Sequence, residues 1–338
     1  MHEVDYLWVG EKSNTGDAIA MRFTRPDTGT DAVVVIDGGF KETGDRIADL
    51  IEEFYDTTTI DLAICTHPDD DHIMGLFTLL ERATVTTLLL HRPRDFGFGP
   101  SDNVKSETVE DLIALAERRG THVEAGQFAG TRLFGGALTI AGPTRDYYAE
   151  TLAEQRALTG SVLSKIAHTA STTFARVRQL IRDPGETMTG DNGGTTPRNN
   201  SSIIVNFLVG DKRALFTGDA GTPALTHAAN TLDLLGLSAA PLDLFDIPHH
   251  GSRHNLTPEL LDRLLGPQTD STRGFAIASV GKQAHDHPRP EVANAIRRRG
   301  YPVVCTRGIN LRWSSPDAPS RASYSSPAEP LGWLEETT

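Results

Sequence analysis

The run Thr66-His67-Pro68-Asp69-Asp70-Asp71-His72 carries the densest group of reactive side chains in this sequence. Five of these seven side chains can bind a metal ion, because imidazole nitrogens and carboxylate oxygens are ligands for hard or borderline divalent cations. The run follows the apolar stretch Asp61–Cys65, which is typical of a buried strand. Open sheet folds tend to place their chemistry at the carboxyl ends of strands. The pattern therefore predicts a metal site directly beyond a strand.

Three further clusters of metal-capable residues also come after strand-like runs. Asp219 follows the first of these runs, His249 and His250 follow the second, and His287 follows the third. Each cluster is weak evidence alone, since a single Gly-Asp pair is usually a turn. Their shared position at strand ends predicts that all four groups lie on one rim of the fold.

Strand-like and helix-like segments alternate along the chain, and these elements must position the rim. The strand-like runs are Val33–Ile36, Leu62–Cys65, Thr87–Leu90, Ser202–Val209, Arg213–Thr217, Leu242–Ile247, Phe275–Val280 and Val303–Thr306. Apolar residues at helical spacing lie between several of them, for example Ile47, Leu50, Ile51 and Phe54. This alternation predicts a mixed α/β fold.

One segment, Thr144–Arg198, breaks the alternation. It is compatible with helix as far as about Ile181 and is then a turn-rich loop. We interpret residues 144–198 as an insertion or lid on a single domain of residues 1–313; a plain surface excursion is the alternative. The Ser/Pro/Ala-rich tail, residues 314–338, is expected to be loosely ordered.

Composition narrows the class of protein. The 338 residues are 38% hydrophobic and 23% charged, which is ordinary for a globular protein. The net charge of −13 gives no indication of a basic surface that would bind nucleic acid. No apolar run approaches the ~20 residues of a membrane span, and the first residues lack the pattern of a secretory signal. Cys65 and Cys305 are expected to be buried thiols. We therefore expect a cytoplasmic protein without a membrane partner, and the oligomeric state stays open.

The opening motif carries a family resemblance. THPDDDH with Ile73-Met74-Gly75-Leu76 resembles the THxHxDHxxG signature of the metallo-β-lactamase fold, with Asp69 at the second ligand position in place of histidine. Together with further motifs, this substitution resembles one branch of the fold: the hydrolase domain of ComEC-type competence proteins and their free-standing relatives. These motifs follow in order along the chain: IDGG at 36–39, NNSS at 199–202, FTGDAG at 216–221, PHHGS at 248–252 and HP at 287–288. The resemblance covers about 300 residues. It implies an α/β (α+β) fold, a four-layer αββα sandwich with a helical and loop insertion.

The resemblance also implies ligands for two divalent ions. These are His67 and Asp69 for the first ion, Asp71 and His72 for the second, and Asp219 between the two. One of His249 or His250 would complete the second site, and His249 is slightly favoured because it lies closer to the strand end. Asp37 would orient a ligand histidine from outside the metal's own shell.

The chain departs from the wider family at Asn199-Asn200-Ser201-Ser202, where many members supply a further histidine. Asn199 and Ser202 would then lie behind the ligands or on the substrate side. The first ion would have fewer and harder ligands, which makes manganese or magnesium plausible beside zinc.

The resemblance implies a metal-dependent hydrolase, and a phosphodiester suits a two-ion site. The expected substrate is DNA, RNA or a nucleotide, and Asp71, Asp219 and His287 are the candidate catalytic residues, with His287 as proton donor or phosphate contact. Small phosphodiesters such as phosphorylcholine esters remain an alternative because of the −13 charge, as does a non-catalytic regulatory module. A lactamase is not expected.

Two assignments stay open from the residues alone. His287 could equally be a structural histidine at the entry of the helix that begins at Pro290. His91, Arg92 and Arg94 follow a strand and could contact substrate, but a solvated loop is the simpler expectation.

Overall fold

Two mixed sheets form the centre of the computed structural model, which describes residues 1–158, 186, 188, 194–321 and 328–336. The first seven-stranded sheet has the order β14-β1-β2-β3-β4-β5-β6. Its strands are β1 (His2–Tyr6), β2 (Ala18–Thr24), β3 (Asp31–Gly38), β4 (Thr59–Ile64), β5 (Thr84–Leu89), β6 (His122–Glu124) and β14 (Leu311–Ser314).

The second sheet has the order β13-β12-β11-β10-β9-β8-β7 and also contains seven strands. They are β7 (Arg132–Leu133), β8 (Leu138–Gly142), β9 (Ile204–Val209), β10 (Lys212–Phe216), β11 (Leu244–Asp246), β12 (Phe275–Ala278) and β13 (Val303–Cys305). The turn expected at Gly210-Asp211 joins β9 and β10, which pair antiparallel.

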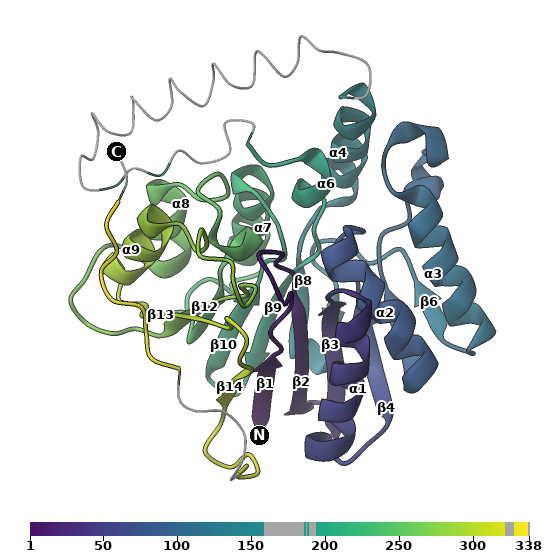
Figure 1. Cartoon of the computed structure of the whole chain (residues 1–338), viewed down its shortest axis with the longest axis horizontal. Coiled ribbons are helices and arrows are strands. Elements are labelled where there is room, and N and C mark those ends of the chain that lie inside the picture. Colours follow the sequence, from purple (N-terminus) through teal and green to yellow (C-terminus); the bar gives the residue numbers. More distant parts are fainter. Residues whose placement is uncertain (159–185, 187, 189–193, 322–327, 337–338) are drawn as a thin grey trace.

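Helices cover the outer face of each sheet, so that the molecule has four layers (Figure 1). The first sheet carries α1 (Lys41–Tyr55), α2 (Asp70–Arg82) and α3 (Ser106–Arg118), and the second carries α7 (Thr222–Leu234), α8 (Pro258–Leu265) and α9 (Pro290–Arg298). The αββα sandwich expected from the sequence is thereby confirmed.

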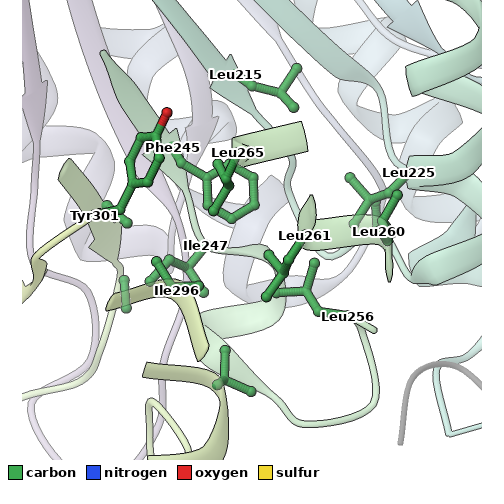
Figure 2. Packing of buried hydrophobic residues seen from close by; sticks show 14 of the residues in the cluster. Leu215, Leu225, Phe245, Ile247, Leu256, Leu260, Leu261, Leu265, Ile296 and Tyr301 are labelled. Carbon is green, nitrogen blue, oxygen red and sulfur yellow. The ribbon is translucent and has the colours of Figure 1, made fainter. Parts of the chain in front are cut away.

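Alternating side chains along the central strands divide the core into three layers. Val33 and Val35 of β3 face the helices of the first sheet, whereas Val34 and Ile36 face the second sheet. Figure 2 shows the outer core of the second sheet, where Phe245 and Ile247 cluster with apolar residues of α8 and α9. Since both faces of the sheets are covered, these strands read as continuous apolar runs in the sequence.

Parallel pairing determines where the loops of the site meet. In the first sheet β3, β4, β5 and β6 run parallel, and in the second β10, β11, β12 and β13 do the same. The carboxyl ends of neighbouring parallel strands lie at one edge of a sheet. The loops after β3, β4, β10 and β11 therefore converge at one end of the sandwich.

The insertion begins with helix α4 (Arg145–Ala157), in agreement with its helix-compatible composition, while residues 159–185 lie outside the described residues. The last part of the insertion contacts the rest of the domain at two places. The buried carboxylate of Glu186 accepts hydrogen bonds from Arg299 Nη1 (2.7 Å) and Nη2 (3.2 Å), beyond α9. The short helix α6 (Pro197–Asn200) then leads directly into the site.

Beyond β14, part of the C-terminal tail is held against the second sheet and α9. The Leu331 amide donates to the Val303 carbonyl (2.8 Å), and Asn294 Nδ2 donates to the Leu334 carbonyl (2.8 Å). No helix among the described residues is long and apolar enough to cross a membrane.

The expectation that His91 lies on a solvated loop is wrong. Its side chain is buried, stacks on Phe128 with ring centroids 4.3 Å apart, and contacts Tyr148 of α4. The aromatic residues that cover it come from distant parts of the sequence, so the local polar context of Arg92 and Arg94 gave the wrong indication.

Candidate metal centre

The loop between β4 and α2 brings His67 into the interior, and the first turn of α2 does the same for His72. Asp69 is the N-cap residue of α2, and Asp70 and Asp71 lie in its first turn, where carboxylates are favoured by the helix dipole. Both histidine side chains are fully buried, whereas Asp70 points to solvent and pairs with Lys105. Asp70 therefore lies outside the cluster.

Asp37, at the end of β3, fixes this loop. Its carboxylate accepts hydrogen bonds from the Thr66 amide (2.8 Å) and the Thr66 hydroxyl (2.6 Å). The same carboxylate lies 2.8 Å from His72 Nδ1. Because a carboxylate can only accept here, His72 Nδ1 carries the proton and Nε2 keeps a free lone pair.

His67 is held in the same tautomer by two hydroxyl groups. Its Nδ1 lies 3.1 Å from Thr66 Oγ1 and 3.3 Å from Ser202 Oγ. Both hydroxyls donate their own hydrogen elsewhere, to Asp37 and to the Asn199 carbonyl, so they accept from Nδ1. The lone pair of His67 Nε2 is therefore free as well.

Asp219, in the loop after β10, lies between four imidazole rings. Its Oδ1 is 3.4 Å from His72 Nε2 and 3.9 Å from His250 Nε2. Its Oδ2 is 3.9 Å from His67 Nε2 and 3.5 Å from His249 Nε2. Each oxygen of one carboxylate thus faces its own pair of ring nitrogens, which is an arrangement suited to bridging two cations.

The kink after β11 sends two adjacent histidines to opposite oxygens of Asp219. His249 (φ 50°) and His250 (φ 57°) both have left-handed backbone conformations. The buried His250 groups with Asp71 and His72 as a possible set of metal ligands, and its Nε2 lies 3.8 Å from Asp71. The sequence slightly favoured His249 for the second site, but the geometry favours His250. His249 faces Asp219 Oδ2 together with His67, whereas His250 faces Oδ1 together with His72.

Asn255 controls the orientation of His249. Its amide group donates to the carbonyls of Asp219 (2.9 Å) and Ala220 (3.1 Å), while its Oδ1 lies 3.2 Å from His249 Nδ1. The amide oxygen can only accept, so His249 Nδ1 carries the proton and Nε2 has a free lone pair. The fully buried Asn255 was not foreseen from the sequence.

Asp17 was also missed. It lies just before β2, is buried, and has Oδ1 3.7 Å from His250 Nδ1 and Oδ2 3.9 Å from His72 Nδ1. Burial raises the pKa of Asp17 above its ordinary value, while the two neighbouring histidines oppose that shift. The adjacent Gly16 is the sequence feature that could have indicated close packing at this position, because a side chain there would collide with the Asp71 carbonyl.

The cluster leaves several buried polar atoms without a hydrogen-bond partner. Among the described residues these are His67 Nε2, His72 Nε2, both ring nitrogens of His250, and Asp219 Oδ1. Buried polar atoms without partners are costly, and groups of free imidazole lone pairs beside carboxylates are the ligands of divalent cations. The residues present therefore fit a metal centre.

Electrostatics favour positive charge in the cluster. Burial alone would raise the pKa of Asp219, but His249, His72 and His250 hold it well below its usual range. Burial would likewise lower the pKa of His250, but Asp17 and Asp219 outweigh it and raise that pKa to about 9. An environment that attracts a proton so strongly also attracts a metal cation.

Asp69 lies at the edge of the cluster. Its Oδ2 is 3.6 Å from His67 Nε2, and its Oδ1 accepts a hydrogen bond from Arg198 Nε. Burial opposes the shift, but His67 and Arg198 lower the pKa of Asp69 well below its ordinary value. Asp69 therefore stays ionised, as a metal ligand must.

The remaining sequence candidates lie around these ligands. Asn199 Nδ2 donates to Asp219 Oδ2 at 3.2 Å, and Ser202 contacts His67 as described. His287 lies in the loop whose Pro288 packs on Gly251, where burial, followed by the charges of His250 and Arg289, lowers its pKa to about 4. His287 is therefore neutral at pH 7.

Together, these observations define a two-sheet sandwich with a cluster of His and Asp side chains at the strand ends that could hold metal ions. The chain matches the model of the Metallo-beta-lactamase superfamily over residues 25–268, and it belongs to that superfamily.

Among solved structures, the chain is similar to a new diphosphatase from the PhnP family (14% identity, TM-score 0.42, covering 93% of this chain and 98% of that one). It is also similar to a metallo-beta-lactamase from Hirschia baltica (15% identity, TM-score 0.33, covering 69% of this chain and 81% of that one). A third similar structure is MEM-A1, a subclass B3 metallo-beta-lactamase from a soil metagenome library (12% identity, TM-score 0.34, covering 78% of this chain and 85% of that one). A search among curated proteins finds no match.

Proposed function

We propose that this protein is a phosphodiester hydrolase that works with two divalent metal ions. The observation that carries the proposal is the position of Asp219, whose two carboxylate oxygens each face two imidazole nitrogens. A bridging carboxylate of this kind is what a two-ion centre needs, since one side chain must serve both ions.

The ligands divide into two sets. His67, Asp69 and His249 would hold the first ion, and Asp71, His72 and His250 would hold the second, with Asp219 shared. Each ion would then have two nitrogen ligands and two carboxylates, a mixed set that suits manganese or zinc and does not exclude magnesium. His249 would take the part of the histidine that is replaced by Asn199-Ser202 in this chain.

Two ions held in this way would activate a water molecule and neutralise the charge of a phosphodiester. The chain's own residues have separate tasks. Asp71, whose carboxylate is partly exposed beside His250, lines the open side of the centre. Burial opposes its ionisation, but His72 and His250 lower the pKa of Asp71, so it remains a carboxylate. Because His287 is neutral at pH 7, it would act as a hydrogen-bond donor to the substrate and not as a general acid.

We place the protein near the ComEC-type hydrolases, with DNA, RNA or a nucleotide as substrate. The support is the set of ordered motifs, in particular Asp69 at the second ligand position and the pair His249-His250. A small phosphodiester such as a phosphorylcholine ester is the alternative, favoured by the net charge of −13.

The test is hydrolysis of bis(p-nitrophenyl) phosphate by wild-type protein and by Asp71→Asn and Asp70→Asn, each with Mn²⁺, Zn²⁺ or Mg²⁺. Asp70 is the matched control, because it adjoins Asp71 but points to solvent. We expect Asp71→Asn to lose activity on the order of 100-fold or more and Asp70→Asn to stay within about twofold.

A panel of linear and circular DNA, RNA, cyclic nucleotides and phosphorylcholine esters would then identify the substrate. Equal activity of wild type and Asp71→Asn on every substrate, or protein that binds no divalent ion, would disprove the proposal. No hydrolysis of any substrate by the wild-type protein would favour a non-catalytic module.

A further inference from the structure

We propose that Arg198 binds a phosphoryl oxygen of the substrate at the first-ion side of the centre. This inference rests on the proposed function, because it assigns a substrate contact to the same site. It concerns a residue of the α6 segment, next to the position where this chain departs from the wider family.

Arg198 reaches the cluster through Asp69. Its Nε donates to Asp69 Oδ1, whereas Asp69 Oδ2 faces His67 Nε2 at 3.6 Å. The guanidinium group therefore lies on the side of Asp69 that is turned away from His67. Both side chains of the ion pair are 20% exposed, so Arg198 stands at the solvent-accessible edge of the buried centre.

Most of the donors of Arg198 are unused. A guanidinium has five N–H donors in a fixed planar fork, and within the described part of the chain only Nε of Arg198 donates a hydrogen bond. The two terminal amino groups, Nη1 and Nη2, are left for solvent or for a ligand. A planar pair of free donors matches two oxygens of a phosphoryl group, because arginine binds such groups in a bidentate way.

The backbone of Arg198 is held rigidly. The Ser201 hydroxyl donates to the Arg198 carbonyl (2.6 Å), and Asn200 Oδ1 accepts from the Gly221 amide (2.9 Å) at the start of α7. On the other side, Asn199 Nδ2 donates to Asp219. The segment that carries Arg198 is thus tied to the metal ligands themselves, and a cation placed in this way loses little entropy when an anion binds.

The charge of the centre calls for an additional cation. The carboxylates in contact with its histidines are Asp17, Asp37, Asp69, Asp71 and Asp219. Two divalent ions carry no more positive charge than these five groups carry negative charge. The ligands thus balance the charge of the ions, and the additional positive charge of Arg198 would strengthen the binding of an anionic phosphodiester.

A different role is conceivable, in which Arg198 only holds Asp69 for the first ion. The two roles differ in what they predict for metal binding. A positioning residue would change the affinity for the metal, whereas a substrate contact would change the affinity for the phosphoryl group at unchanged metal content.

The experiment measures binding of diphenylphosphinate to Mn²⁺-loaded protein by isothermal titration calorimetry. This anion has the charge and two free oxygens of a phosphodiester but no bond to hydrolyse, so binding is read without turnover. The variants are Arg198→Ala, Arg198→Lys and the control Arg82→Ala, whose guanidinium pairs with Asp45 and Asp49 on α1. Mn²⁺ stoichiometry and affinity are measured for each variant.

We expect Arg198→Ala to weaken diphenylphosphinate binding about 10- to 100-fold, with Mn²⁺ binding within about twofold of wild type. Arg198→Lys should recover part of the affinity, since it restores the charge but not the planar fork, and Arg82→Ala should match wild type. The Michaelis constant for bis(p-nitrophenyl) phosphate should rise in parallel.

Three results would overturn the inference: wild-type affinity in Arg198→Ala, loss of Mn²⁺ from that variant, or no binding of diphenylphosphinate to wild-type protein. Failure of the proposed function has a separate signature. Diphenylphosphinate would then bind through Arg198, but no phosphodiester of the panel would be hydrolysed.

Discussion

In three of the four histidines of the centre, the tautomer is decided by the partner of the second ring nitrogen. His72 is oriented by Asp37, His67 by two hydroxyl groups, and His249 by Asn255. Such partners fix the tautomer and therefore the direction of the free lone pair. The ligand types could be predicted from the sequence, because a run of His and Asp has few other uses. Partners such as Asn255 could not, since an isolated asparagine carries no local pattern.

Replacing Asn255 by alanine should therefore weaken the first ion selectively. His249 would lose the acceptor that keeps its proton on Nδ1, and removal of such a partner typically costs 10- to 100-fold in metal affinity. We expect one weakened and one wild-type site in a Mn²⁺ titration followed by electron paramagnetic resonance.

The control is Asn230→Ala, which removes an exposed hydrogen bond between α7 and Arg263. Two sites of unchanged affinity in Asn255→Ala would contradict the assignment of His249 to the first ion.

At the scale of elements, the parallel strands were the easiest part to predict. Their apolar runs and the polar clusters that follow them predicted His67, Asp219 and the pair His249-His250 at one rim without knowledge of the fold. Asp17 was missed because β2 runs antiparallel to β3, which brings its amino end to the same rim. A rule based on carboxyl ends cannot find such a residue. His91 was misplaced because its aromatic neighbours come from distant segments, including α4.

The aromatic cluster around His91 should make the stability of the protein depend on pH. Burial lowers the pKa of His91 from 6.5 to about 4, because the charged ring would lose its hydration. The unfolded chain binds this proton below pH 6.5, while the folded chain resists it down to about pH 4. The stabilisation is therefore fully present above pH 6.5 and is lost as the pH falls towards 4, by at most about 3 kcal/mol.

Urea unfolding between pH 4 and 7.5 would measure this effect as the slope of the unfolding free energy against pH. His91→Gln should flatten the slope in that window relative to wild type. His122→Gln is the matched control, because that side chain is largely exposed, and it should leave the slope as it is. Identical slopes in all three proteins would show that His91 is not protonated on unfolding.

For the whole molecule, the centre joins the two halves of the sandwich. His67 and the first turn of α2, with Asp71 and His72, follow β4 of the first sheet, whereas Asp219, His249 and His250 follow β10 and β11 of the second. Across this junction the imidazole nitrogens of one half face carboxylate oxygens of the other. The sequence placed these groups near one another, and the family resemblance already implied Asp219 between the two ions. The structure adds that each oxygen of Asp219 faces two imidazole nitrogens.

Metal removal should therefore destabilise the entire fold rather than one loop. A ligand that binds only the folded state stabilises it by about 2.7 kcal/mol at 100 times its dissociation constant. For a protein of this size, adding Mn²⁺ or Zn²⁺ to chelator-treated protein should raise the melting temperature by roughly 5 °C. Differential scanning calorimetry of wild type and Asp219→Asn, each with and without metal, measures this increment. Asp219→Asn should lose most of it, because the amide cannot bridge two cations; an equal increment in both proteins would mean that the stabilising ions bind elsewhere.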